Sequence, residues 1–127
     1  MHADVERLNY LSGRVIGCAV IVLNTLGVGF LEKVYENALA HEIRAAGLAV
    51  AQQYGFKVHY NGMVVGEYLG DLLVEGALPV ELKTVKALDD VHRMQCTNYL
   101  KASGLRLCLL LNFGKPRLEI KRIILGL

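Results

Sequence analysis

"GDLLVEGALPVELKTV", residues 70–85, reads as two apolar strand segments around a tight turn, yet it carries three charged residues inside those segments. They are Asp71, Glu81 and Lys83. Charged side chains are rarely fully buried unless they are paired or bind a metal ion. The stretch therefore indicates either a polar site on a buried sheet or a strand end that reaches solvent.

The turn Glu75-Gly76-Ala77 sets which residues face each other. A three-residue loop would place Asp71 directly across from Glu81, whereas a two-residue loop would make them diagonal neighbours. Two close carboxylates in an apolar setting repel each other and titrate upward unless a cation lies between them. Mg²⁺ prefers oxygen ligands and suits such a pair. Lys83 shares the face of Glu81 and can orient a water or stabilise developing phosphorane charge.

The alternative is a partly exposed strand end at which Glu81 and Lys83 form a surface salt bridge. The spacing of Asp71, Glu81 and Lys83 alone favours this alternative, because such spacings are common.

Periodicity on either side of this stretch predicts an α/β fold. Helices are expected over residues 5–26, 30–46 and 89–102. Residues 56–68, "FKVHYNGMVVGEY", predict a hairpin around Asn61-Gly62, and residues 68–74 can continue its second strand. Further strands are expected over residues 78–85, 105–113 and 117–125. The order α-α-β-β-β-α-β-β predicts a central mixed β-sheet flanked by helices.

Composition limits the possible classes of protein. The 127 residues fit one domain, residues 1–127, and the net charge of +2 does not by itself indicate nucleic acid. Three cysteines without CxxC spacing argue against a disulfide framework or a zinc knuckle and favour a reducing cytoplasm. Asp4 and Glu6 argue against a signal peptide. Residues 15–31 are uncharged but interrupted by glycines, so we expect a buried helix and no membrane span.

Polar residues on two helices change how the charged triplet is interpreted. Glu32 lies among apolar neighbours, three residues before Tyr35. Gln95 and Tyr99 are four residues apart and in phase with the apolar stripe of their helix. Taken singly, each is more often a hydrogen-bonded core residue. Together with Asp71, Glu81 and Lys83 they predict a polar site between a sheet and two helices.

The stretch "GFLEKVY", with Gly29, Glu32 and Tyr35, resembles the signature of the GxxExxY protein family of the PD-(D/E)XK nuclease superfamily. The resemblance continues through "YNGMVVGEYLGDLLVEG", "VELKTV", "VHRMQCTNYLKASG" and "LLLNFGKPRLEIKRI". It implies a restriction-endonuclease-like core. It also implies that Asp71 and Glu81 are metal-binding acids, that Lys83 is the catalytic lysine, and that Gln95 and Glu32 complete the site, with Tyr35 and Tyr99 in support.

We expect one divalent ion, Mg²⁺ or Mn²⁺, on Asp71 and Glu81, with the Leu82 carbonyl as a third oxygen and Glu32 bound directly or through water. The chain also departs from the family pattern. Ile21 and Leu23 stand where relatives tend to carry Glu and His, and Leu69-Gly70 replaces the usual Arg-Ala.

Two functions follow as hypotheses. The first is a Mg²⁺-dependent phosphodiesterase acting on DNA or RNA. The second is a catalytically inactive module of the same fold that binds nucleic acid or protein. A second apolar stripe on the first helix, Ile16, Val20 and Leu23, predicts a two-fold homodimer through that helix. The alternative is that the hairpin or the C-terminal strand covers this stripe.

Overall fold

The computed structural model describes residues 2–126 of the chain. The helices are α1 (His2–Leu26), α2 (Glu32–Ala45) and α3 (Asp90–Ser103). The strands are β1 (Val50–Tyr60), β2 (Met63–Val74), β3 (Leu78–Lys83), β4 (Leu107–Asn112) and β5 (Glu119–Ile124). The α/β class and the element order predicted from the sequence are confirmed.

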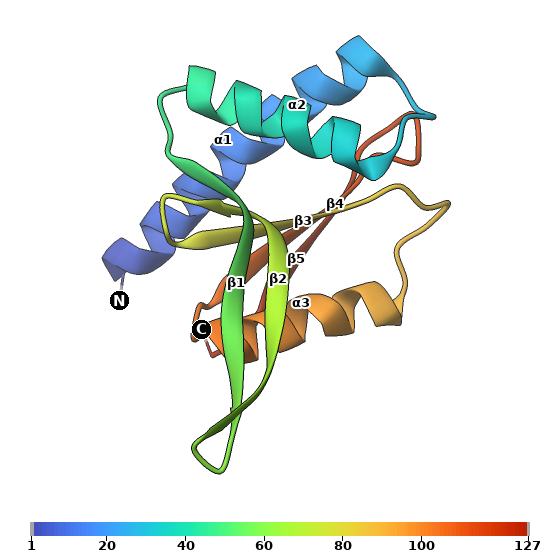
Figure 1. Cartoon of the computed structure of the whole chain (residues 1–127). Helices are drawn as coiled ribbons and strands as arrows, with labels where there is room; N and C mark the ends of the chain where they lie inside the picture. The colour runs from blue at the N-terminus through green and yellow to red at the C-terminus, as the bar shows by residue number, and fades with distance from the viewer. Residues whose placement is uncertain (1, 127) are drawn as a thin grey trace.

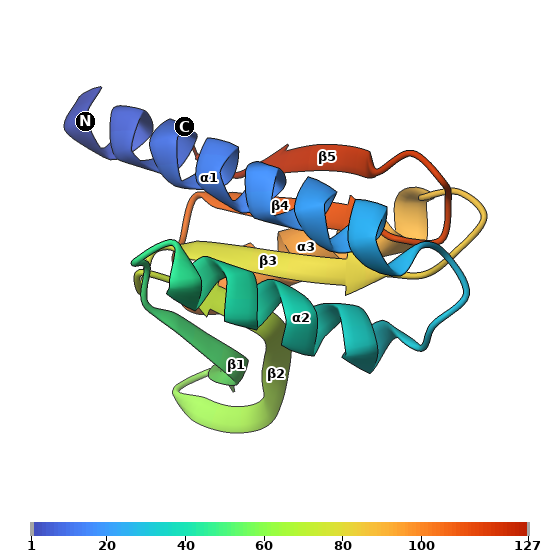
Figure 2. The same ribbon diagram turned by 90° about the horizontal axis from the view of Figure 1, so that it is seen from above.

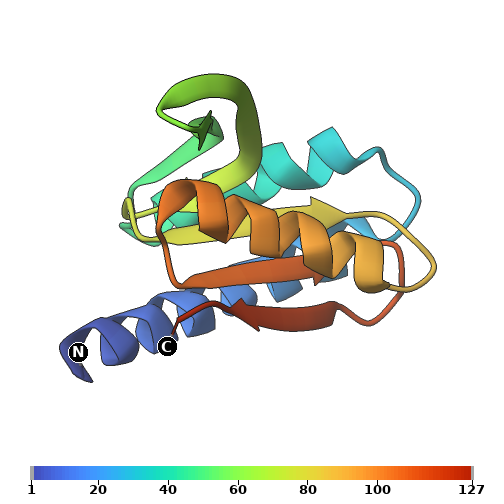
Figure 3. The same cartoon turned by 90° about the horizontal axis from the view of Figure 1, so that it is seen from below.

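The five strands form one sheet in their chain order, β1-β2-β3-β4-β5. Neighbouring strands are antiparallel except β3 and β4, which are parallel because α3 connects them as a crossover. The sheet is therefore mixed, as predicted. Helices α1 and α2 cover one face of the sheet and α3 covers the other (Figures 1, 2 and 3).

Alternation along the strands divides the apolar residues between two cores. Beneath α1 and α2 lies the larger core, which includes Leu109 and Leu111 of β4. Beneath α3 lies a smaller core formed by Cys96, Leu100, Cys108 and Leu110. From α1 the larger core takes most of the stripe predicted for that helix, namely Leu8, Leu11, Val15, Ala19 and Val22. Burial of this stripe fixes α1 on the sheet.

The hairpin of β1 and β2 is longer than the sequence indicated. The first strand begins at Val50 instead of Phe56, and the second is continuous from Met63 to Val74. The polar residues Gln52 and Gln53 interrupt the hydrophobic pattern, so the first half of β1 is not predicted as a strand from the sequence. Only the last part of β2 pairs with β3, through Leu72–Val80, Leu73–Pro79 and Val74–Leu78. The outer half of the hairpin therefore projects beyond the sheet (Figure 1).

The second stripe of α1 is partly covered within the chain. Leu23 is only 3% exposed, and Ile16 packs against the larger core together with Leu118 and Ile120. Val20, at 40% exposure, lines a hollow with Leu23 and Ile120. The C-terminal strand thus covers much of this stripe, and the homodimer stays a prediction that rests mainly on Val20.

Among the described residues, α1 is the one helix whose length and composition would allow it to cross a membrane, over Asp4–Leu26. Of that window, 44% is buried inside the fold. Core helices of soluble proteins meet the same criteria, so this is weak evidence for a membrane span.

Gly70 makes room for a buried tyrosine on α3. A Cβ atom at this position would lie 2.3 Å from the ring of Tyr99, which is fully buried. The Tyr99 ring also packs edge-on against Phe56 and Tyr68, at centroid distances of 5.3 and 5.7 Å. Because the Tyr99 ring packs against Phe56 and Tyr68 as well as Gly70, it cannot shift easily. The departure from the family pattern at Gly70 is therefore matched by the packing of Tyr99.

Gly70→Ala should lower the free energy of unfolding by about 1–3 kcal/mol, because the added methyl group overpacks a filled site. Urea denaturation would measure the change. The matched control is Gly66→Ala in the same strand, where an added Cβ meets nothing within 4 Å. Equal stability of the two variants would contradict the account of Tyr99.

Candidate functional site

The loop between β2 and β3 has three residues, so Asp71 lies across from Glu81. The pairs Val74–Leu78, Leu73–Pro79 and Leu72–Val80 end one residue before these two acids, which occupy the next facing positions. Glu75 and Gly76 adopt positive φ angles of 54° and 65° in the turn. Of the two registers that the sequence allowed, the structure has the one that puts the carboxylates directly opposite each other.

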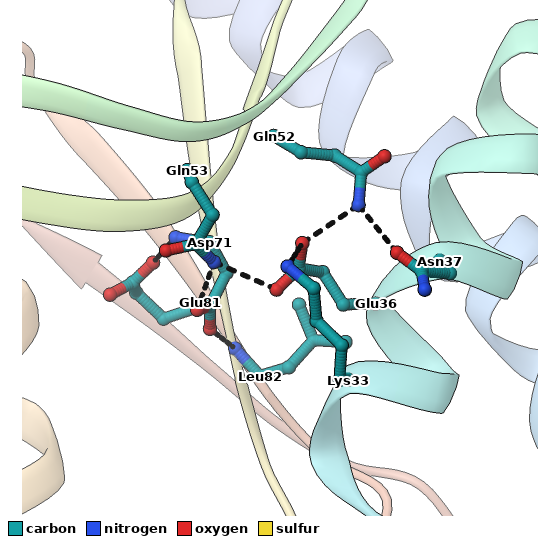
Figure 4. Close-up of polar contacts among 8 residues, drawn as sticks. All are labelled: Lys33, Glu36, Asn37, Gln52, Gln53, Asp71, Glu81 and Leu82. Carbon is teal, nitrogen blue, oxygen red and sulfur yellow. Dashed lines mark hydrogen bonds and ion pairs between the residues drawn. The ribbon is translucent and has the colours of Figure 1, made fainter.

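Each of these two acids binds the backbone of the facing strand. The Asp71 N–H donates to Glu81 Oε2 at 2.7 Å, and the Leu82 N–H donates to Asp71 Oδ2 at 2.8 Å (Figure 4). These two hydrogen bonds replace the backbone–backbone hydrogen bonds that would otherwise continue the pairing of β2 with β3. The exchange holds both carboxylates at the point where β2 and β3 separate.

Burial of these acids disfavours their ionised forms. Glu81 is 7% exposed, and burial together with the nearby Asp71 raises its pKa to about 8, against the opposing effects of the Asp71 N–H and Lys83. Burial also raises the pKa of Asp71, although the Leu82 N–H counteracts it. The pKa of Glu32 is raised by burial and by Asp71. Burial is thus the main cause of all three shifts, and a neighbouring carboxylate adds to each.

An acidic pocket of about 340 Å³ opens over this pair of carboxylates. It brings together four of the residues predicted for the site. Its lining is Glu67, Tyr68, Leu69, Asp71, Glu81, Lys83 and Gln95. Gln95 enters from α3, while the others come from β2 and β3. Glu32 does not line the pocket, but the first residue of α2 is near enough for its charge to act on that of Glu81.

Two of the signature residues shape the loop that precedes α2. Gly29 has a φ angle of +108°, which residues other than glycine rarely adopt. The Tyr35 hydroxyl donates to the Gly27 carbonyl and accepts from the Phe30 N–H. The Tyr35 ring, fully buried, stacks on Phe113. Gly29 and Tyr35 therefore hold the loop that positions Glu32, the first residue of α2, near the site.

The backbone after Lys83 is held by the end of β4. The Phe113 N–H donates to the Lys83 carbonyl at 2.7 Å. The buried Asn112 side chain accepts from the Val85 N–H and donates to the Val85 carbonyl, at 3.0 and 2.8 Å. Gly114 permits this approach, because a Cβ there would lie 2.3 Å from the Val85 carbonyl oxygen. These contacts restrict where Lys83 can lie.

Sequence reasoning missed a buried carboxylate next to the site. Glu36, 3% exposed, accepts hydrogen bonds from Lys33, Gln52 and Gln53 at 2.9, 2.7 and 2.8 Å (Figure 4). Gln53 also reaches Asp71 Oδ1 at 3.5 Å. The signal that could have found Glu36 is its position one helical turn after Glu32.

The two glutamines reach the same acid because the strand is distorted between them. Side chains of consecutive strand residues normally point to opposite faces. Gln53, however, has φ +55°, which is rare for a residue other than glycine. This backbone conformation lets the Gln53 side chain turn toward both Glu36 and Asp71. Within β1 the strained residue is thus the one that lies at the site.

The donor set fits a hard divalent ion only in part. Among residues 2–126, no three His, Cys, Asp or Glu side chains come together as a metal-binding group. Asp71 and Glu81 nevertheless offer carboxylate oxygens on one pocket, and a bound cation would favour their ionised forms, which burial disfavours. Mg²⁺ usually keeps several waters and needs only one or two carboxylates. Two acids and water would therefore suffice.

Comparisons with known proteins agree with this geometry. The profile of the PD-(D/E)XK nuclease superfamily matches residues 9–123. A solved structure entitled "Crystal structure of SSO0001" is similar to this chain, with a TM-score of 0.59 and 16% identity. The similarity covers 75% of this chain and 50% of that one, so the chain spans about half the length of that structure. No curated protein matches the chain.

Without metal, the protein should lose stability as the pH rises from about 5 to about 8. In this window the folded state keeps a proton on Glu81, whose pKa is about 8, and the unfolded state releases it at the ordinary value of 4.5. The loss should be on the order of a few kcal/mol. The raised pKa values of Asp71 and Glu32 act in the same direction.

Urea denaturation at both ends of this range, in the presence of a chelator, would measure the loss. Glu81→Gln should flatten the dependence, whereas Glu67→Gln, an exposed acid of the same pocket, should preserve it. A wild-type protein equally stable at both pH values would refute the expected shift.

Proposed function

The chain belongs to the GxxExxY family of the PD-(D/E)XK nuclease superfamily, and from this we propose that it is a divalent-metal-dependent phosphodiesterase that hydrolyses nucleic acid. The observation that carries the proposal is the pair Asp71 and Glu81, which lie opposite each other on one pocket together with Lys83 and Gln95. Burial raises the pKa of both acids, so holding them ionised costs the fold stability that a bound cation would restore, which supports a role in binding one.

Each residue has a distinct part in the proposed reaction. Asp71 and Glu81 would hold the ion, with the Leu82 carbonyl and Glu32 as further oxygen donors. A divalent ion bound there supplies Lewis-acid chemistry and a more acidic water. The ammonium group of Lys83 would orient the attacking water and stabilise charge on the phosphorane. Gln95, from the opposite wall of the pocket, would donate a hydrogen bond to the phosphate or to the water.

A second candidate function is a binding module without catalysis. Leu69 favours it, because this exposed apolar residue lines the pocket at a position where related proteins tend to carry an arginine. A pocket that lacks this cation has one fewer group to bind a phosphate. Ile21, another of the departures, is on the exposed face of α1 and does not line the pocket.

Metal binding is the first test. Calorimetric titration with Mn²⁺ and Mg²⁺ should show one site in the wild type and none in Asp71→Ala. Saturation should raise stability by about 2.7 kcal/mol at a hundredfold excess over the dissociation constant. Glu67→Gln is the control, because this acid lines the pocket outside the facing pair. No heat and no stabilisation with millimolar Mn²⁺ would eliminate the metal site.

Cleavage is the second test. If the wild type cleaves single- or double-stranded DNA or RNA, Lys83→Ala should slow the reaction by on the order of 10² or more while fold and metal binding remain. Gel assays with Mn²⁺ would measure the rate. Lys86→Ala, an exposed lysine three residues further on, is the control. The proposed role of the lysine is excluded if the Lys83→Ala variant cleaves as fast as the wild type. The binding module is supported if the wild type binds metal but cleaves none of these substrates.

A further inference from the structure

A second hollow, of about 470 Å³, lies beside the acidic pocket between the outer hairpin and α3. Lys57 and His59 of β1, Tyr68 of β2, and Asn98 and Lys101 of α3 line it together with Val58 and Ala102, so basic and polar groups stand around a largely apolar wall. We call it the basic groove. The function proposed above does not use it.

The basic groove has positive charge without a matching acid. No Asp or Glu lines it. Glu67, which is opposite Lys57 in the hairpin register, lines the acidic pocket instead. Within residues 2–126 the ion pairs of the structure do not include Lys57 or Lys101. Both lysines are exposed, so their charges are available to an anionic ligand.

The basic groove and the acidic pocket adjoin each other. Tyr68 lines both, and its hydroxyl donates to the Gln95 carbonyl at 2.7 Å, which fixes the ring between them. Gln95 of the pocket and Asn98 and Lys101 of the groove recur at three-residue steps, so one face of α3 runs along both hollows. The helix rise places Gln95 and Lys101 about 9 Å apart along the axis.

We propose that the basic groove binds the sugar–phosphate backbone of a single nucleic-acid strand, beside the bond that is held at Asp71 and Glu81. The inference rests on the proposed function for the class of ligand. Lys101 lies about 9 Å along the helix axis from Gln95, so it is placed for a phosphate that neighbours the one at the acids. The hollow of about 470 Å³ between the hairpin and α3 has room for one strand, and a duplex is wider than this space. Asn98 adds an amide that can bind a base edge.

The test measures binding without cleavage. Fluorescence anisotropy of a short labelled DNA strand, with EDTA present and over a series of salt concentrations, gives the affinity and its salt dependence. Each lost phosphate contact lowers the slope by about 0.7 for a single strand, so Lys57→Gln plus Lys101→Gln should lower it by about 1.4. Affinity at low salt should fall on the order of tenfold or more.

Arg44→Gln plus Arg117→Gln is the matched control. It removes the same charge from exposed residues on α2 and before β5, outside the groove. This pair should leave the slope unchanged. The inference is overturned if both double variants behave alike, if the wild type does not bind the strand, or if a duplex of the same sequence binds more tightly. An RNA strand that binds with the same dependence on Lys57 and Lys101 supports it, because the backbone is the shared ligand.

The groove and the proposed hydrolysis can fail separately. Loss of binding in the groove variants, with no cleavage by any variant when Mn²⁺ is present, supports the groove and removes the hydrolase. Cleavage by the wild type, with unchanged binding in the groove variants, supports the hydrolase and removes the groove. Both lysines are exposed, and an unchanged urea midpoint would show that the variants remain folded.

Discussion

The exchange of hydrogen bonds between Asp71 and the strand that carries Glu81 is the constraint on which the remaining architecture depends. At this point β2 stops pairing with β3, and side-chain carboxylates take over the backbone donors of the two strands. The hairpin can then leave the sheet without unsatisfied buried N–H groups. The pocket opens at the same place, because separated strands leave room for ligand between the sheet and α3. The acids thus have a structural part as well as the chemical one proposed for them.

Much of the fold could be predicted from residue patterns. The stripe of α1, the Asn61-Gly62 turn and the apolar run of β4 each follow from one local rule, and all lie where expected. The beginning of β1 could not be predicted, because Gln52 and Gln53 are polar and no local pattern shows that Gln52 is opposite Leu72 of β2. For the site, Asp71, Glu81, Lys83 and Gln95 come together on one pocket. Glu36 was missed because a lone acid in a helix normally faces water.

The departures from the family pattern have different structural meanings. Gly70 is tied to the buried Tyr99 ring, and Leu23 is part of the larger core, so each is explained by packing. Leu69 is exposed at the pocket and lies over Gly55 of the facing strand, outside both apolar cores. Among Gly70, Leu23 and Leu69, only at Leu69 would a substitution alter the pocket and leave the two apolar cores unchanged. The lining of the pocket can therefore vary at Leu69 independently of the fold.

The projecting hairpin has a consequence for how such a chain can diversify. Its tip, Asn61-Gly62, lies outside both apolar cores, and the residues beside it, Tyr60 and Met63, are largely exposed. Insertions at exposed turn tips disturb little buried backbone and are tolerated for that reason. Extra residues at this tip would lengthen the projecting hairpin without moving the acids, so the reach of this arm can evolve by simple loop growth.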